Sequence, residues 1–189
     1  VEEETGLQVK ILDESIFSQT KENEIILCLN YDGLYGINNI NRFMQANNLS
    51  LAVEWGDHIF KENDPILFKD NNRFKGLLYN NLKGRIHKIE KEKNKITFTI
   101  DVYRQLTELD ANLYTLELIS VDQGKSRIRF SVEKYESIED DEDSSLMTIV
   151  PFQIAYAVSI HKAQGLEYDS VKVVISSEVD EQITHNIFY

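Results

Sequence analysis

Three short and almost entirely apolar runs predict buried strands. They cover Ile25–Leu29, Ile154–Ser159 and Val171–Ile175. Near-continuous aliphatic runs of this length are typical of parallel strands that other layers cover on both faces. The chain is therefore expected to contain a parallel sheet of the α/β class.

A helix is expected soon after the first run. The turn-rich loop Asn30–Gly36 leads into Ile37, Ile40, Phe43 and Met44, which recur at helical spacing. A strand, a glycine loop and a helix in this order form one half of an α/β unit.

Between residues 57 and 136 the hydrophobic period changes to two. Ile96, Phe98, Ile100 and Val102 alternate strictly with polar residues, which predicts a half-buried strand. Asp122–Lys125 (DQGK) lies between two further strand-like runs and signals a tight hairpin. Roughly five short strands with tight turns predict a small antiparallel β-barrel or a curled sheet.

The composition is that of an ordinary globular protein, with 42% hydrophobic and 28% charged residues. No apolar run approaches the ~18 residues that a membrane-spanning helix needs, so no membrane partner is expected. The one cysteine, Cys28, lies within an apolar run and fits a buried thiol in a reducing cytoplasm. The four histidines are scattered along the chain, so no metal site is predicted.

The net charge of −12 argues at first against nucleic-acid binding. The charge is unevenly distributed, because residues 57–136 carry 15 basic and 13 acidic residues, whereas the rest of the chain carries 5 and 19. The acidic run Glu139–Asp143 is expected to be a solvated linker. The middle region is thus the relatively basic part, and a local strip of positive potential can still attract phosphate.

The turn between the last two apolar runs is dense in groups that bind anions. It contains His161, Lys162 and Gln164, followed by Gly165, which lets a backbone approach a ligand closely. Open α/β sheets bind ligands at the carboxyl ends of their strands, and this turn is expected at such an end. It is therefore the first candidate for a functional site.

The residues around this turn resemble a helicase motif. Ala155–Tyr168, which reads AYAVSIHKAQGLEY, is similar to motif V of superfamily 1 DNA helicases of the UvrD/RecD type. Earlier in the chain, Gly33–Gln45 (GLYGINNINRFMQ) resembles the start of the second RecA-like domain of that family. RecD-type members carry a Src-homology-3-like barrel inserted in this domain, and the strand-rich middle region is similar to it.

The resemblance implies a division of the chain into three parts. Residues 1–56 would form the first part of a RecA-like α/β domain, and residues 57–137 an inserted β-barrel. Residues 138–189 would supply an acidic linker and the second part of the RecA-like domain with motif V. The implied fold class is α/β, a partial RecA-like parallel sheet with an inserted small antiparallel barrel of the Src-homology-3-like type.

The resemblance also implies roles for individual residues of the turn. The nucleotide would be contacted by Gln164, Gly165 and Glu167, with the carboxylate near the ribose hydroxyls. The phosphates of single-stranded DNA, or of RNA, would be contacted by Ser159, His161 and Lys162. A turn that touches both ligands is a suitable coupler, because closure around the nucleotide would move the nucleic-acid contacts.

The middle region offers a second candidate surface for single-stranded nucleic acid. Basic and aromatic residues are interleaved there, which suits bases that stack on rings and phosphates held by cations. The candidates are Arg73, Phe74, Lys75, Tyr79, Lys83 and Arg85. The alternative is a solvated sheet edge that lysines protect from pairing with other chains.

The sequence as a whole is interpreted as the C-terminal part of an ATP-dependent DNA helicase. In the intact parent, ATP with Mg²⁺ would bind between this part and an N-terminal RecA-like domain of the same chain. Neither the P-loop nor the motif VI arginine of the family is present, so the isolated chain is predicted to hydrolyse ATP at background rate and to bind no cofactor tightly. An alternative is a non-catalytic module on a degenerate helicase scaffold that binds a protein or a nucleic acid. A stand-alone hydrolase has little support, because no nucleophile motif or acid–base pair is recognisable.

Overall fold

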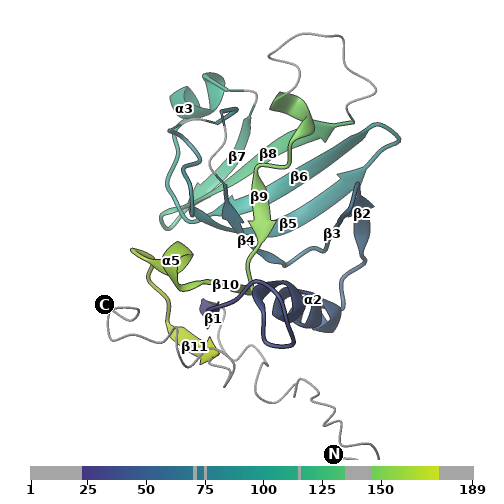
Figure 1. The fold of residues 1–189 in the computed structure, drawn as a ribbon. Helices are drawn as coiled ribbons and strands as arrows, with labels where there is room; N and C mark the ends of the chain where they lie inside the picture. The colour runs from purple at the N-terminus through teal and green to yellow at the C-terminus, as the bar shows by residue number, and fades with distance from the viewer. Residues whose placement is uncertain (1–22, 70–71, 75, 115, 135–145, 175–189) are drawn as a thin grey trace, which may run out of the picture. The chain divides into compact units, whose positions relative to one another are not determined.

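The computed structural model describes residues 23–69, 72–74, 76–114, 116–134 and 146–174 of the 189-residue chain (Figure 1). The chain divides into two compact units. One unit comprises Val1–Asn47 with Tyr156–Tyr189, and the other comprises Asn48–Ala155. The expected segments Val1–Lys21, Glu139–Asp143 and the C-terminal residues after Val174 lie outside the described residues.

The first unit contains a three-stranded parallel sheet. Its strands are β1 (Glu24–Cys28), β10 (Ala157–Ser159) and β11 (Ser170–Val174), in the order β10-β1-β11. The helix α2 (Ile37–Asn47) follows β1, and the short helix α5 (Ile160–Ala163) follows β10. The small parallel sheet expected from the apolar runs is therefore confirmed.

The apolar positions of this unit form its interior, as their spacing predicts. Ile37, Ile40 and Met44 are the buried residues of α2, and they recur on one face of the helix. On β1, Ile26 and Cys28 are also buried, and burial raises the pKa of the Cys28 thiol to about 12. The prediction of a buried thiol is confirmed.

The expected continuous strand Ile154–Ser159 is wrong, because two different sheets share this run. β9 (Phe152–Ile154) pairs antiparallel with β4, whereas β10 pairs parallel with β1. The change occurs between Ala155, whose N–H donates to the Pro65 carbonyl at 2.9 Å, and Tyr156, whose carbonyl accepts from the Ile26 N–H at 3.0 Å. Residues 155–159 are all buried and Ile154 is half-buried, so the apolar pattern of this run does not reveal where one sheet ends and the next begins.

The second unit is built on a six-stranded antiparallel sheet in the order β7-β8-β6-β5-β4-β9. A separate hairpin consists of β2 and β3 (Figure 1). The short helix α3 lies between β6 and β7 of the six-stranded sheet, and the short helix η2 lies between β8 and β9. The bounds are β2 Val53–Trp55, β3 His58–Phe60, β4 Pro65–Phe68, β5 Lys83–Lys91, β6 Lys95–Val102, α3 Glu108–Asn112, β7 Glu117–Asp122, β8 Lys125–Glu133 and η2 Leu146–Thr148.

A small antiparallel barrel or a curled sheet was expected, and the structure shows an unclosed sheet in place of the barrel. Among the described residues β7 and β9 each have one strand neighbour, so the six strands form an open sheet. The alternating pattern and the hairpin signals predict which neighbours in the sequence pair, but closure depends on contacts between the first and last strands, which no local pattern encodes. The unit also extends beyond the expected range 57–137, because β9 adds a strand after it.

One face of this sheet carries the core of the second unit. Four phenylalanine rings meet there at centroid distances of 5.0 to 5.6 Å along the series Phe98–Phe152, Phe60–Phe98 and Phe60–Phe152, with Phe130 6.1 Å from Phe98. Most of these pairs are edge-to-face, the arrangement that the ring quadrupole favours. The predicted alternation of β6 is confirmed, since Ile96, Phe98, Ile100 and Val102 are fully buried.

The hairpin between β7 and β8 is formed as predicted. Asp122 and Lys125 are partners in the ladder, and the two residues between them, Gln123 and Gly124, have φ angles of 45° and 81°. Positive φ at both central positions suits the twist of the flanking strands, and glycine adopts it without strain.

No helix among the described residues is long and apolar enough to cross a membrane.

Candidate functional site

Two glycine-bearing loops begin at the same edge of the parallel sheet. Cys28 ends β1 and Ser159 ends β10, and these two residues are register partners in the parallel ladder. The loop to α2 follows the first strand, and the turn that begins with α5 follows the second. Both loops therefore lie at the carboxyl ends of adjacent strands, where open α/β sheets bind ligands.

The first loop is closed by backbone hydrogen bonds that start α2. The Ile37 N–H donates to the Asn30 carbonyl and the Asn38 N–H to the Tyr31 carbonyl, each at 3.0 Å. A Cβ on Gly36 would lie 2.4 Å from the Asp32 carbonyl oxygen, so only glycine fits there. Gly33 has a φ of 91°, a left-handed conformation that glycine adopts readily.

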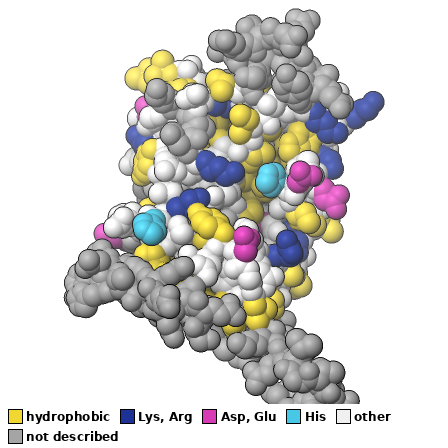
Figure 2. Space-filling model, viewed as in Figure 1, with side chains coloured by type: hydrophobic (Ala, Val, Ile, Leu, Met, Phe, Trp, Pro, Cys, Tyr) yellow, Lys and Arg dark blue, Asp and Glu magenta, His cyan; other side chains and the backbone are white. Residues whose placement is uncertain are grey.

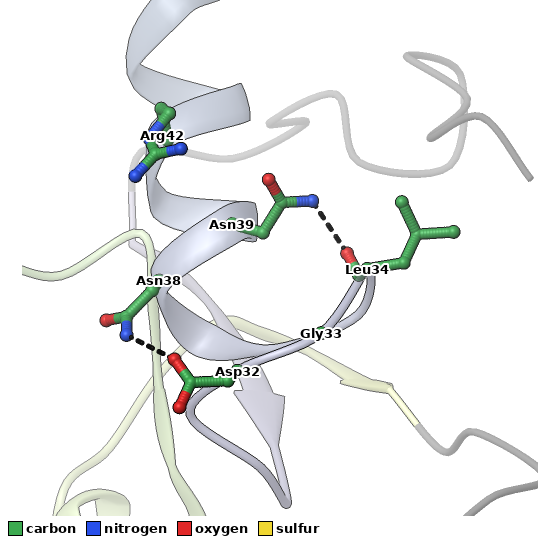
Figure 3. Close-up of a pocket in the computed structure, with 6 residues that line it drawn as sticks. All are labelled: Asp32, Gly33, Leu34, Asn38, Asn39 and Arg42. Carbon is green, nitrogen blue, oxygen red and sulfur yellow. Dashed lines mark hydrogen bonds between the residues drawn. The ribbon is translucent and has the colours of Figure 1, made fainter.

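An open pocket of about 440 Å³ lies beside this loop at the beginning of α2 (Figure 3). Asn38 Nδ2 donates to the Asp32 carboxylate at 3.1 Å, and Asn39 Nδ2 donates to the Leu34 carbonyl at 2.9 Å. The lining residues are Asp32, Gly33, Leu34, Asn38, Asn39 and Arg42. The glycine loop was expected from the sequence, but Asp32 and Arg42 were not predicted as site residues. For Arg42, the available signal was a charged residue in the first two turns of the predicted helix.

The asparagine Asn41 of the helicase-like segment Gly33–Gln45 has a structural position. Its side chain exchanges two hydrogen bonds with the backbone of Ala157 on β10, each 2.9 Å long. Asn41 therefore ties α2 to the strand that leads into the second loop.

The second loop brings together all the turn residues named from the sequence. Ser159 is buried at the N-cap of α5 and makes no capping hydrogen bond through its hydroxyl. His161 is exposed and Lys162 half-buried, within the single turn of α5. After α5 come the exposed Gln164 and Gly165, the latter with a φ of 79°.

Glu167 is exposed shortly beyond this glycine. The turn is held by the Leu166 N–H, which donates to the Ala163 carbonyl at 3.0 Å. Polar groups expected to contact the nucleotide and groups expected to contact nucleic acid thus share one short segment that directly follows β10.

In the second unit, two of the predicted surface residues point inward. Phe74 is fully buried, with its ring 5.2 Å from that of Phe130, so it is a core residue rather than an exposed stacking platform. The Arg73 guanidinium lies 4.8 Å from the Phe74 ring centroid, and its Nη1 donates to the Ser131 carbonyl at 2.7 Å. Burial lowers the pKa of Arg73 to about 10, although the charge of Glu133 opposes this shift.

The other predicted residues of this unit do not form one continuous strip. Tyr79 is 49% exposed, whereas Lys83 and Arg85 are half-buried on β5. The Arg85 Nη1 donates to the Asn63 carbonyl at 2.8 Å. Lys75 lies outside the described residues.

Three residues beside Tyr79 and Lys83 were not named from the sequence. The Arg104 guanidinium lies 5.3 Å from the Tyr79 ring centroid, and the ring of Tyr103 has Lys125 Nζ at 4.5 Å and Lys83 Nζ at 5.3 Å. Tyr103 and Arg104 directly follow β6, Lys125 begins β8, and Tyr79 lies in the loop before β5, so the cluster depends on contacts between segments that are distant in the chain. The visible face in Figure 2 shows Lys and Arg side chains dispersed among acidic and hydrophobic ones.

Within the described part of the chain, no three His, Cys, Asp or Glu side chains are grouped so that they could hold a metal ion.

Comparison with known proteins gives a distant structural similarity. No protein-family model matches the sequence, and no curated protein matches it. The fold is distantly similar to Pif1 helicases, which belong to superfamily 1. For an unliganded Pif1 from Bacteroides sp. the identity is 16% and the TM-score 0.39, with 84% of this chain and 48% of that chain covered.

A second structure of this kind describes DNA unwinding at forked double-stranded DNA by two coordinating Pif1 helicases. Its identity to this chain is 16% and its TM-score 0.40, with 85% of this chain and 35% of that chain covered. The chain thus spans between a third and a half of the length of these two proteins.

Proposed function

We propose that this chain is the C-terminal part of an ATP-dependent DNA helicase motor, in which it supplies one wall of the ATP cleft and contacts to single-stranded DNA. The observation that carries this proposal is the register pair Cys28–Ser159, which places the glycine loop after β1 and the turn after β10 at one edge of the parallel sheet. Both loops are the segments with helicase-like sequence. A ligand at this edge would meet both of them.

The nucleotide side of the proposed site consists of Gln164, Gly165 and Glu167. The exposed Gly165 has no atom within 4 Å of the position of a Cβ, so the backbone there is open to a ligand. The exposed Glu167 carboxylate accepts hydrogen bonds and suits the ribose hydroxyls of ATP. Gly124-Lys125-Ser126 is not a P-loop, because Ile119 stands where the pattern requires its first glycine and the three residues belong to the β7–β8 hairpin. In the proposed motor, the lysine that holds the phosphates would come from an N-terminal RecA-like domain.

The nucleic-acid side consists of Ser159, His161 and Lys162. The Lys162 ammonium and the exposed His161 imidazole offer donors to phosphate oxygens, and the Ser159 hydroxyl begins the same turn. The two sides are joined through one turn of helix, so a shift of Gly165 on nucleotide binding would move Lys162. This connection is the physical basis for coupling hydrolysis to movement along the strand.

Binding of this chain to a fluorescein-labelled thymidine oligonucleotide tests the nucleic-acid side. Lys162→Ala is expected to weaken binding and to reduce the salt dependence by about one phosphate contact, a slope change of roughly 0.7 in log K against log salt. The matched control is Lys91→Ala, which removes an exposed lysine at the end of β5. Equal effects of the two substitutions would contradict a specific role for Lys162.

The motor itself is tested by ATP hydrolysis and by the flanking reading frame. The chain alone is expected to hydrolyse ATP at background rate, with or without single-stranded DNA, and DNA-stimulated turnover by this chain would contradict the proposal. A P-loop encoded upstream would support it. In that parent protein, Lys162→Ala should lower DNA-stimulated hydrolysis and leave DNA-independent hydrolysis unchanged.

A second candidate function is a non-catalytic module that binds a nucleic acid or a protein. The observation that favours it is the exposed Tyr79 ring with the Arg104 guanidinium beside it, which belongs to the second unit and needs no nucleotide. A parent reading frame without a P-loop, together with binding that Lys162→Ala does not change, would favour this candidate over the motor.

A further inference from the structure

Three strands of the second unit align a lysine, a tyrosine and a second lysine in one row. Gly84 pairs with Val102 on β6, and Val102 pairs with Ser126 on β8; all three are buried. Their neighbours Lys83, Tyr103 and Lys125 are therefore adjacent across the strands and face away from the core. The Tyr103 N–H donates to the Lys83 carbonyl at 3.0 Å, which extends the ladder to this row.

Both lysines of this row approach the same ring. Lys125 Nζ lies 4.5 Å and Lys83 Nζ 5.3 Å from the centroid of Tyr103. These distances are within the range of cation–π interactions, which orient the ammonium groups around the ring. The row thus places two positive charges over one half-buried aromatic ring.

A second ring lies beside a cation that follows Tyr103 in the chain. The Arg104 guanidinium is 5.3 Å from the Tyr79 centroid, and its Nη1 donates to the carbonyls of Leu77 at 2.7 Å and Gly76 at 3.2 Å. These two hydrogen bonds fix the guanidinium in place. The Tyr79 side chain is 49% exposed, so about half of its surface is open to a ligand.

Two carboxylates border this ring cluster, defined as Tyr79, Lys83, Tyr103, Arg104 and Lys125. Asp122 is the ladder partner of Lys125. Capping hydrogen bonds from Thr107 lower the pKa of Asp110, and the charge of Arg104 adds to this shift. Three cations against these two acids leave a local positive excess in a chain whose net charge is −12.

Charge and aromatic surface together select the ligand. A duplex hides the faces of its bases, whereas a single strand exposes them to rings. A purely acidic protein segment would contact the cations but would not stack on the rings. Unpaired bases with their phosphates use both features of the cluster.

We propose that the ring cluster binds single-stranded nucleic acid, with bases stacked on Tyr79 and Tyr103 and phosphates held by Lys83, Arg104 and Lys125. This inference deepens the proposed function, on which its choice of ligand rests, but it places the contact in the other unit of the chain. Because every base has an aromatic face, binding here is tolerant of sequence.

The test compares three fluorescein-labelled probes of equal length by anisotropy, namely a thymidine oligonucleotide, an abasic strand with the same phosphates, and a duplex. The thymidine strand is expected to bind most tightly. Tyr103→Ala and Tyr79→Ala should each weaken its binding by about 5- to 150-fold, the range of a lost base–ring stack. Tyr103→Phe retains the ring and should bind as the unchanged protein does.

The charged contacts are tested separately. Lys125→Gln should reduce the slope of log K against log salt by roughly 0.7. Lys91→Gln, at the end of β5 opposite Lys83, should leave this slope unchanged. Circular dichroism melting of each variant shows whether the fold is retained. A tyrosine variant that unfolds is replaced by the corresponding Leu variant, which keeps apolar contact and lacks the ring.

Equal affinity for the thymidine and abasic strands, or equal binding by Tyr103→Ala and Tyr103→Phe, would overturn the inference. So would tighter binding of the duplex. The outcomes also separate this inference from the proposed function. Loss of binding in Lys162→Ala without any effect of the tyrosine variants removes only the ring cluster, whereas a tyrosine effect without any effect of Lys162→Ala removes only the turn after β10.

Discussion

Asn41 and Ala157 are joined by two hydrogen bonds, although they lie 116 positions apart in the chain. The Asn41 Nδ2 donates to the Ala157 carbonyl and its Oδ1 accepts from the Ala157 N–H, both at 2.9 Å. β10 is the end strand of the described parallel sheet, and Ala157 is paired with Ile26 on its other side. The asparagine amide thus occupies the place of a further strand and satisfies both backbone groups of one residue.

Replacing Asn41 is therefore expected to destabilise the parallel unit. Asn41→Ala leaves the Ala157 N–H and carbonyl without their partner, which should lower the free energy of unfolding by about 1–3 kcal/mol. Urea denaturation measures the change. Asn47→Ala, an exposed substitution at the end of α2, is the control and should have little effect; an equally small effect of Asn41→Ala would contradict the structural role.

The Cys28 thiol is expected to react slowly while the protein is folded. It is fully buried, and its pKa is raised from 9.0 to about 12, so almost no thiolate forms at neutral pH. Labelling with a disulfide reagent should proceed at the rate of unfolding and become fast in urea. Rapid labelling of the folded chain would contradict the burial.

The same shift makes stability depend on pH. Because the folded-state pKa is the higher one, the contribution of Cys28 is fully present below about pH 9 and is lost as the pH rises from about 9 toward 12. Cys28→Ala removes this titration. The variant should therefore lose less of its stability than the unchanged chain over that range.

Two glycines of the candidate site should respond differently to alanine. A Cβ at Gly36 would meet the Asp32 carbonyl oxygen at 2.4 Å, so the loop before α2 must shift. At Gly165 a Cβ meets no atom within 4 Å, but the φ of 79° costs an L-residue about 1–2 kcal/mol. Gly36→Ala is thus expected to destabilise the chain more than Gly165→Ala in urea unfolding. The reverse order would show that the loop accommodates the added methyl group.

Phe74 provides a test of the difference between core and surface. Phe74→Leu leaves a space beside Phe130 and should lower the free energy of unfolding by roughly 1–3 kcal/mol. Because the ring is fully buried, affinity of the folded variant for a thymidine oligonucleotide should stay unchanged. Weaker binding without loss of stability would restore Phe74 as a surface contact.

Some elements could be predicted from the residues around them. The helix α2 follows from the spacing of Ile37, Ile40 and Met44, and the hairpin at Gln123–Gly124 follows from its turn residues. Candidate residues of the turn after β10 were found together because they are neighbours in the chain. Their ligands stay predictions.

Other features depended on partners that are distant in the chain. Arg73 and Phe74 have the composition of a nucleic-acid surface, yet the second is in the core and the first is packed over it. Nothing in the adjacent residues distinguishes a ring that stacks on a ligand from one that stacks on Phe130. Tyr103 could not be identified as a surface residue from its neighbours in the sequence, because the lysines beside its ring come from two other strands.

The sequence by itself determined which segments are buried and with what period, because burial of apolar side chains acts on each segment through its own pattern. Only the tertiary structure decided that Ala155 and Tyr156 belong to different sheets, that the six strands stay open among the described residues, and that Tyr103 lies between two lysines. Each of these depends on which strands pair and in what register. Strand pairing depends on two distant segments together. The hydrophobic period of one strand is the same whichever strand pairs with it, so the period does not specify the partner.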